Sequence, residues 1–317
     1  MNNKTLIYDL KNDDDKNHTH CGVYFEIKFF LNKYYLFYWS NNKLKLVISN
    51  TLFFEGKPIT ILNNIPGCVF TILQENNGLF ILCGCHNSNK EQNEILIPDL
   101  VWPNEKKTIL DWKVSRIDRK NGMYLLFSKD GKSWKNISEK PVLHRYISSS
   151  TCKLGEVAFD THPCLIKHNN TYIYFGRLNS SLDERRLYIR KSNDLLNWSL
   201  PEKINILNEN KNNLKKNYYN LVVFNYNNIF YGFSQYFEAC GTENRNCSNG
   251  CTLLLKSENL LDWTIINSYL FHKDKYKDRI EGVIFEDENT LRVFFRENCN
   301  SAINQNLISY LFSLNDL

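Results

Sequence analysis

The chain has 317 residues, of which 43% are hydrophobic and 14% are aromatic, so it can bury a sizeable core. Its net charge of +5 is spread along the sequence and includes no basic arm, so we expect no nucleic-acid partner. No apolar run approaches the length that crosses a bilayer, which argues against a membrane partner.

The compartment is not fixed by the sequence. The N-terminal residues lack the apolar core of a signal peptide, which makes a soluble intracellular monomer the default expectation. Of the ten cysteines, Cys240, Cys247 and Cys251 lie close together. Free thiols, a loop-pinning disulfide and zinc binding remain alternatives for them, although the spacing matches no standard zinc pattern. We therefore expect neither a cofactor nor a metal.

A repeated motif, Ser-x-(Asp/Asn/Glu)-x-x-x-Trp, indicates the architecture. It occurs as SKDGKSW at 128–134, SNDLLNW at 192–198 and SENLLDW at 257–263, with copies starting about 64 residues apart. Each copy follows an apolar run, which predicts a strand, a tight turn and a second strand that opens with a buried Trp. The segment ISNTLFF near residue 48 is a degenerate copy without the Trp.

A second element precedes each copy in chain order. It is an apolar strand, a short turn that contains Asn, and an aromatic strand, and it occurs at 24–39, 68–84, 163–177, 221–235 and 282–298. Asn tolerates the left-handed conformation that such turns require. Five of these hairpins predict an all-β fold, a five-bladed β-propeller of four-stranded antiparallel blades. We place the blades at roughly 20–62, 66–143, 157–207, 217–270 and 279–315 in a single domain, with residues 4–9 as a closing strand. A β-sandwich is the alternative, but it has no reason to repeat a four-stranded unit.

These motifs occur together with an inner strand that follows an Asp, in FDTHPCLIKHNNTYIYFGR. In these features the chain resembles the five-bladed propeller glycosidases, which include arabinanases, xylosidases and invertases. The resemblance covers nearly the whole chain and is strongest from residue 123 to 263. It implies an axial funnel with acidic residues near the starts of the innermost strands. The loops that join second and third strands of each blade would rim the same opening.

The resemblance also implies catalytic residues, because glycoside hydrolysis needs two carboxyl groups across the scissile bond. Asp160 matches the family's Asp of the third blade, and Asp13, Asp14 and Asp15, of which we favour Asp15, are nearest to its Asp of the first blade. A capping role and a solvated acidic tail are the respective alternatives.

The family's general acid is a Glu at the start of the fourth inner strand, where this chain reads KNYYNLVVF without an acid. Glu281, at the start of the fifth inner strand, is our candidate substitute; Glu238 and Glu297, expected in rim loops, are further candidates. A surface or structural role is the alternative for each.

Substrate-binding candidates converge on the same rim. Arg177 and Arg296 end equivalent strands, where planar guanidinium groups suit sugar hydroxyls, a carboxylate or a phosphate. His162, Tyr219 and Glu297 complete the set, and structural packing or salt bridging is the alternative for all five. The stretch from 86 to 121, with Trp102 and Trp112, is too long for a plain connection and suggests a lid or packing on the propeller side.

The sequence therefore predicts a glycoside hydrolase-like propeller that acts on a carbohydrate through acidic residues in the funnel. The alternative is a non-catalytic propeller that binds a glycan or another partner, which the missing fourth-blade Glu favours. A phosphate or nucleotide-sugar site at Arg177 and Arg296 is a third possibility.

Overall fold

The computed structural model is all-β. It describes residues 4–13, 24–40, 43–63, 69–84, 94–100, 114–138, 140–148, 156–158, 161–181, 184–209, 215–239, 250–269, 279–297 and 305–317. Within these ranges the helical segments are the two 3-10 turns η1 (Leu10–Asn12) and η2 (Leu314–Asp316), each of three residues. No helix of the described part is long enough to cross a membrane.

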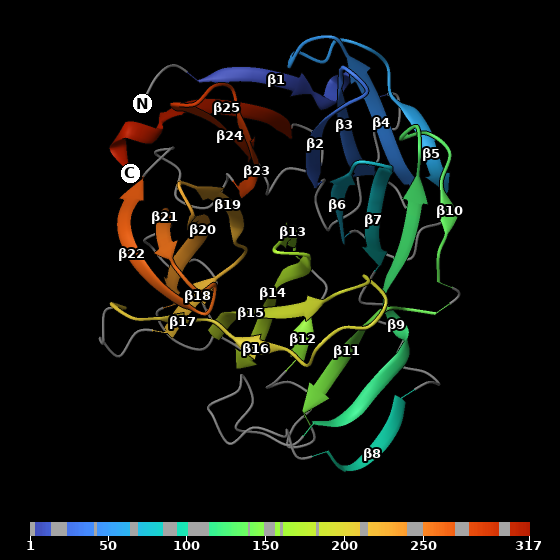
Figure 1. The fold of residues 1–317 in the computed structure, drawn as a ribbon, viewed down its shortest axis with the longest axis vertical. Helices are drawn as coiled ribbons and strands as arrows, with labels where there is room; N and C mark the ends of the chain where they lie inside the picture. Colours follow the sequence, from blue (N-terminus) through green and yellow to red (C-terminus); the bar gives the residue numbers. More distant parts are fainter. Residues whose placement is uncertain are drawn as a thin grey trace.

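Antiparallel hairpins surround the middle of the molecule. In the described part of the chain they are β2 (Phe25–Phe30) with β3 (Lys33–Ser40), β6 (Val69–Glu75) with β7 (Gly78–Gly84), β13 (Cys164–His168) with β14 (Thr171–Ser181), β19 (Val222–Tyr226) with β20 (Ile229–Ala239), and β23 (Arg279–Phe285) with β24 (Thr290–Glu297). The first strands contact one another in the cyclic order β2, β6, β13, β19, β23 and back to β2. Figure 1 shows these first strands nearest the centre of the view, with the other strands farther out.

Further strands extend each hairpin outward. They are β4 (Lys43–Ser49) and β5 (Ile59–Asn63) beside β3; β9 (Val114–Ser128) and β10 (Lys135–Asn136) beside β7; β15 (Glu184–Ser192) and β16 (Glu202–Lys203) beside β14; β21 (Gly250–Ser257) and β22 (Asp262–Tyr269) beside β20; and β25 (Asn306–Ser313) beside β24. Shorter pairings join β8 (Glu94–Leu100) and β11 (Leu143–Ser148) to β9, β12 (Glu156–Ala158) to β14, β17 (Asn205–Ile206) to β22, and β18 (Lys215–Tyr218) to β20.

The N-terminal segment completes the last sheet. Strand β1 (Thr5–Asp9) pairs antiparallel with β25, so the first and last strands of the chain lie side by side (Figure 1). This confirms the closing strand that the sequence predicts. The two ends of the chain therefore lie in one sheet, and β1 forms the outer edge of that sheet.

Pairs of Asn residues make the tight turns of two described inner hairpins, β13–β14 and β19–β20. Asn169 and Asn170 have φ of 47° and 60°, and Asn227 and Asn228 have φ of 52° and 63°. Two consecutive left-handed residues are the mark of a type I′ turn, whose twist matches that of the flanking strands. Asn supplies this geometry in a chain that has only 13 glycines.

The repeated Ser-to-Trp motif forms one turn at each copy. In the copy at 192–198, the hydroxyl of Ser192 accepts from the backbone N–H of Asp194, and Asp194 Oδ1 accepts from the N–H of Asn197 at 2.7 Å. The indole of Trp198 donates back to the Leu195 carbonyl at 2.8 Å, and Leu195 is left-handed with φ of 64°. The copies that end at Trp134 and Trp263 repeat this indole bond. The motif is therefore a turn-forming unit, as the sequence predicts. The predicted burial of its Trp is complete at position 263 only, because Trp134 and Trp198 are half-buried.

Part of the long stretch from 86 to 121 is strand. Residues 94–100 form β8, which pairs with the first half of β9, so this stretch extends the second hairpin system. Residues 101–113, with Trp102 and Trp112, lie outside the described ranges.

Candidate functional site

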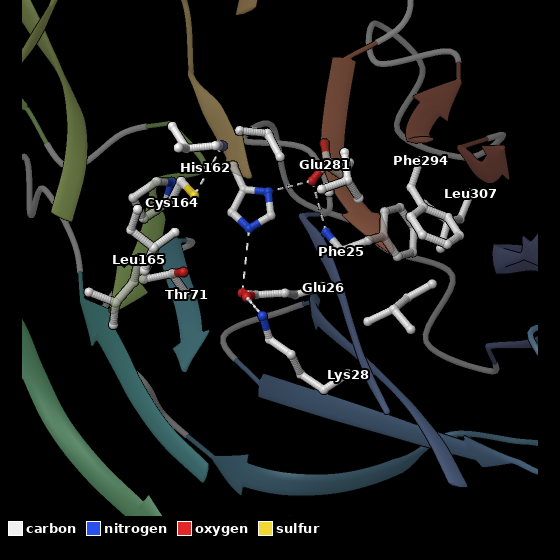
Figure 2. A pocket seen from close by; sticks show the side chains of 17 residues that line it. Phe25, Glu26, Lys28, Thr71, His162, Cys164, Leu165, Glu281, Phe294 and Leu307 are labelled. Atoms are coloured by element: carbon white, nitrogen blue, oxygen red, sulfur yellow. Dashed lines mark hydrogen bonds and ion pairs between the residues drawn. The ribbon is translucent and has the colours of Figure 1, made fainter. Parts of the chain in front are cut away.

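A histidine lies between two glutamates at the middle of the ring. His162 lies two residues before the start of β13. Its Nδ1 atom lies 2.9 Å from Oε2 of Glu281 on β23, and its Nε2 atom lies 3.7 Å from Oε2 of Glu26 on β2. Figure 2 shows the imidazole ring between the two carboxylates. Three inner-strand segments, more than a hundred residues apart in sequence, therefore meet through one imidazole.

Each glutamate has further partners. Glu281 accepts from the backbone N–H of Phe25 at 3.0 Å and lies 3.2 Å from Nε of Arg296. Glu26 accepts from the backbone N–H of Ile72 at 2.8 Å, and its Oε1 lies 2.8 Å from Nζ of Lys28 (Figure 2). The glutamates thus also join neighbouring inner strands: Glu281 reaches from β23 to the start of β2, and Glu26 reaches from β2 to β6.

Strand geometry explains why these side chains converge. Residues two apart in a strand point to the same face, so Glu26 and Lys28 share a face of β2. The Arg296 Cα is paired in the ladder with Leu307, and its guanidinium lies over the ring of Tyr24 at 4.6 Å. The aromatic ring and the Glu281 carboxylate together hold this completely buried cation.

The burial of the cluster controls its ionisation. Burial alone would lower the pKa of His162, but the hydrogen bonds and negative charges of Glu26 and Glu281 outweigh it and raise this pKa to about 9. For Glu26, burial acts to raise the pKa, but Lys28 and His162 outweigh it, and the pKa is lowered. The imidazolium form of His162, ion-paired with carboxylates, is therefore the stable form at neutral pH.

A small cavity adjoins the cluster. Its volume is about 140 Å³, and its polar lining includes Glu26, Lys28, Thr71, His162 and Glu281. The remaining wall is largely apolar, and Val222, Phe294 and Leu307 contribute to it. Drug-sized and cofactor ligands usually occupy pockets of roughly 300–1,000 Å³, so this cavity is small for a sugar chain and suits water or a single small group.

A second polar cluster surrounds Tyr219, which lies just before β19. The guanidinium carbons of Arg177, Arg279 and Arg185 lie 4.7, 5.0 and 5.2 Å from the centre of the Tyr219 ring. All three distances are within the range of cation–π attraction. Asn220, the next residue, donates to the Ile280 carbonyl at 2.6 Å and so fixes this segment against the start of β23. Because Arg279 lies two residues before Glu281, the two clusters are adjacent.

The predicted site residues fall into three groups. Asp160, Asp14 and Asp15 lie outside the described ranges. His162, Glu281 and Arg296 come together in the first cluster, and Arg177 and Tyr219 in the second.

The remaining acidic candidates lie elsewhere. Glu297 is the last residue of β24 and forms an ion pair with Lys4. Glu238 is part of β20. Both residues were expected in rim loops, and that prediction is wrong because both lie in strands. Asp13 is buried, accepts from the Tyr38 hydroxyl at 2.8 Å and forms an ion pair with Lys45. Asp13 thus has the partners of a structural anchor between the N-terminal segment and β4.

Four members of the clusters were not predicted from the sequence: Glu26, Lys28, Arg185 and Arg279. A signal for Glu26 and Lys28 was present, because a Glu and a Lys at alternate positions of the apolar inner strand FEIKFF face the same way. No local pattern distinguishes Arg185 or Arg279 from a surface arginine. Their convergence on Tyr219 arises from the arrangement of β14, β15 and β23 around it.

No metal-binding group of His, Cys, Asp or Glu occurs among the described residues. Burial raises the pKa of the Cys83 thiol to about 12 and that of Cys164 to about 11, so neither is a reactive thiolate at neutral pH. Cys251 lies on β21, and Cys240 and Cys247 are outside the described ranges.

Solved structures identify the fold. An N-acetylgalactosamine deacetylase from F. plautii, in complex with blood group B trisaccharide, matches with a TM-score of 0.58 at 13% identity over 95% of this chain and 92% of that chain. An α-L-arabinofuranosidase from Fusarium graminearum, in complex with an iminosugar inhibitor, matches with a TM-score of 0.55 at 12% identity over 99% and 98%. An α-L-arabinanase from Penicillium chrysogenum, in complex with arabinobiose, matches at 0.51 and 12% identity over 99% and 98%. The chain has the fold of the propeller glycosidases.

This result confirms the resemblance to arabinanases, xylosidases and invertases as a likeness of fold. No family model and no curated protein matches the sequence. The fold by itself does not determine the reaction, since one of the matching propellers is a deacetylase. Function has to be argued from the two clusters.

Proposed function

We propose that the protein is a single-domain, five-bladed propeller that binds a carbohydrate at the mouth of its axial funnel. The cyclic contacts of β2, β6, β13, β19 and β23 support five blades, in the order predicted from the sequence. The matching arabinanase and deacetylase were solved with bound sugars, which supports a carbohydrate as the ligand.

The observation that carries the proposal is the cluster around Tyr219. A half-buried tyrosine with guanidinium groups on its ring combines a flat apolar surface with fixed hydrogen-bond donors. Sugars present an apolar ring face and a rim of hydroxyls, so this combination suits them. The cluster lies at the end of the ring where β19 and β23 begin, which is the end at which the resemblance to the propeller glycosidases leads us to expect the mouth of the funnel.

The first cluster, around His162, is better suited to a protein that binds a sugar without hydrolysing it than to a catalyst. A general acid is usually a carboxyl group in apolar surroundings, whereas Glu281 contacts the Arg296 guanidinium and the His162 imidazole. The adjoining cavity of about 140 Å³ leaves little room for a sugar ring between Glu26 and Glu281. In this proposal His162 and its partners are a structural centre beneath the binding surface.

Tyr219→Ala tests the proposal, with Tyr226→Ala as the matched control. Tyr226 is also half-buried, but it lies at the opposite end of β19, beside the Asn227–Asn228 turn. We expect a glycan array probed with the wild-type protein to give ligands whose affinity falls at least about tenfold in Tyr219→Ala and changes little in Tyr226→Ala. Equal losses in both variants, or no glycan bound by a folded protein, would contradict carbohydrate binding at this site.

Glycoside hydrolysis is the second candidate, and the position of two carboxylates beside one cavity favours it. In that case Glu281 would serve as acid, with Asp160 and Asp15 as the other acidic groups. Incubation with arabinan, xylan and fructan oligosaccharides tests it. New reducing ends from the wild-type protein, absent with Glu281→Gln, would establish hydrolysis, whereas intact oligosaccharides that bind would support recognition alone.

A further inference from the structure

Three arginines from different segments share one aromatic ring. Arg177 comes from β14, Arg185 from β15 and Arg279 from the first position of β23, and their guanidinium carbons all lie within 5.2 Å of the Tyr219 ring centre. A ring has two faces, so at least two of the three cations lie on the same side of it. Such a concentration of positive charge is more than a neutral sugar requires.

The surroundings hold these groups in place. Arg177 is only 4% exposed, and Arg185 donates to the Asn217 side chain at 3.2 Å. Arg185 Cα is also paired with Asn217 of β18, and Arg279 Cα with Arg296 of β24. Guanidinium groups held by burial, by a side-chain hydrogen bond and by the Tyr219 ring lose little conformational freedom when a ligand binds.

The cluster also remains within reach of solvent. Arg185, Tyr219 and Arg279 are each partly exposed, while Arg177 is buried. Positive charges packed around one ring repel one another, and an anion bound among them is attracted by all three. The planar guanidinium fork matches a carboxylate, sulfate or phosphate group through paired N–H donors.

From this geometry we propose that the carbohydrate bound at Tyr219 is acidic, and that Arg279, Arg185 and Arg177 bind its anionic group while the sugar ring packs on Tyr219. This inference rests on the proposed function and names its ligand class, a glycan with a carboxylate or a sulfate ester. Both carriers present the same chemistry to the arginines. Recognition then depends on a charge that neutral arabinan or fructan lacks.

Matched ligands that differ only in charge give the test. Isothermal titration calorimetry would compare oligogalacturonate with its methyl ester, and a sulfated glycosaminoglycan oligosaccharide with its desulfated form. We expect the uronate or the sulfated chain to bind, and the corresponding neutral form to bind at least about tenfold more weakly. Added salt should lower the affinity for the acidic ligand. Whichever charged series binds identifies the source of the anionic group.

Variants connect the charge preference to this cluster. Arg279→Gln should lower the affinity for the acidic ligand about tenfold or more and lower the affinity for the neutral form by a clearly smaller factor, since it removes a positive charge at a partly exposed position but keeps a side-chain hydrogen-bond donor. Lys135→Gln, which removes one positive charge from an exposed position on β10, is the control and should change neither.

The outcomes separate the two proposals. Equal affinity for acidic and neutral partners would overturn the acidic ligand and keep carbohydrate binding. Binding of inorganic sulfate or phosphate that Arg279→Gln abolishes, without binding of any sugar, would support the anion site and overturn the carbohydrate function. Preferential binding of the acidic ligands that Arg279→Gln leaves intact would overturn the assignment to this cluster.

Discussion

The Nδ1 atom of His162 lies 2.9 Å from Oε2 of Glu281, and both side chains are almost completely buried. The same carboxylate contacts Arg296 and the backbone of β2, so it neutralises two buried cationic groups and ties two inner strands together. A carboxylate with these partners has a large structural role.

Removing this carboxylate should therefore cost far more stability than removing an exposed one. We expect Glu281→Ala to lower the free energy of unfolding by about 3–5 kcal/mol, because it leaves Arg296 and His162 buried without their shared partner. Urea denaturation followed by tryptophan fluorescence measures the change. Glu75→Ala is the control, since Glu75 pairs with Lys167 at 3.0 Å in a partly exposed bridge and should cost less than about 1 kcal/mol. Similar losses in both variants would show that the Glu281 network contributes no special stability.

Stability should also depend on the proton of His162. Its pKa is about 9 in the folded protein and about 6.5 when unfolded, so its contribution is complete below about pH 6.5 and is lost as the pH rises through 9. By linkage the contribution amounts to at most about 3 kcal/mol.

The comparison with His162→Gln isolates this dependence, because the other titrating groups are common to both proteins. The stability advantage of the wild type over the variant should shrink between pH 6.5 and 9.5 in denaturation experiments at constant ionic strength. An advantage that stays constant, or that grows over this interval, would show that His162 is not held as an imidazolium.

Much of the fold could be predicted because its signals are local. The Ser-to-Trp turn is held by bonds that span three residues or fewer, as in Trp198 to Leu195, and such a unit leaves the same pattern wherever it recurs. Two of the described inner hairpins likewise depend on Asn pairs at their own turns, Asn169–Asn170 and Asn227–Asn228. Repetition of local patterns was therefore enough to predict the hairpins and their order along the chain.

The site could be predicted only in part, because its contacts depend on the closure of the ring. Phe25 and Glu281 are bonded across 256 positions, and Glu26 reaches His162 only because β2 and β13 lie on either side of β6. The fold-family resemblance directed attention to strand starts, which was enough to find His162 and Glu281. It could not indicate Arg185 or Arg279, since a cation–π cluster leaves no spacing pattern in the sequence.

The repeated turns should contribute unequally to stability, in proportion to the burial of their tryptophans. Trp263 is completely buried and its indole donates to Leu260 at 2.8 Å, whereas Trp134 is half-buried and donates to Gly131 at 3.2 Å. Trp263→Ala should cost about 3–5 kcal/mol of unfolding free energy. Trp134→Ala should cost clearly less in the same urea titrations monitored by circular dichroism. The opposite order would mean that the turn bond, rather than the buried area, determines the contribution.

The closing strand β1 provides a comparison of two neighbouring residues with opposite exposure. Ile7 is 2% exposed and packs with Phe25, Leu36 and Phe294, while Leu6 is 51% exposed. If β1 stabilises the molecule by joining its ends, Ile7→Ala should lower the unfolding free energy by about 2–5 kcal/mol. Leu6→Ala should change it by no more than about 0.5 kcal/mol.

Thermal and urea unfolding of the two variants measure the difference, and size-exclusion chromatography reports whether loosening β1 exposes the edge of β25 to another molecule. Unchanged stability in Ile7→Ala would show that β1 is not required to hold the last sheet together. A loss confined to Ile7→Ala, accompanied by self-association, would show that the N-terminal strand both closes the fold and protects its final edge.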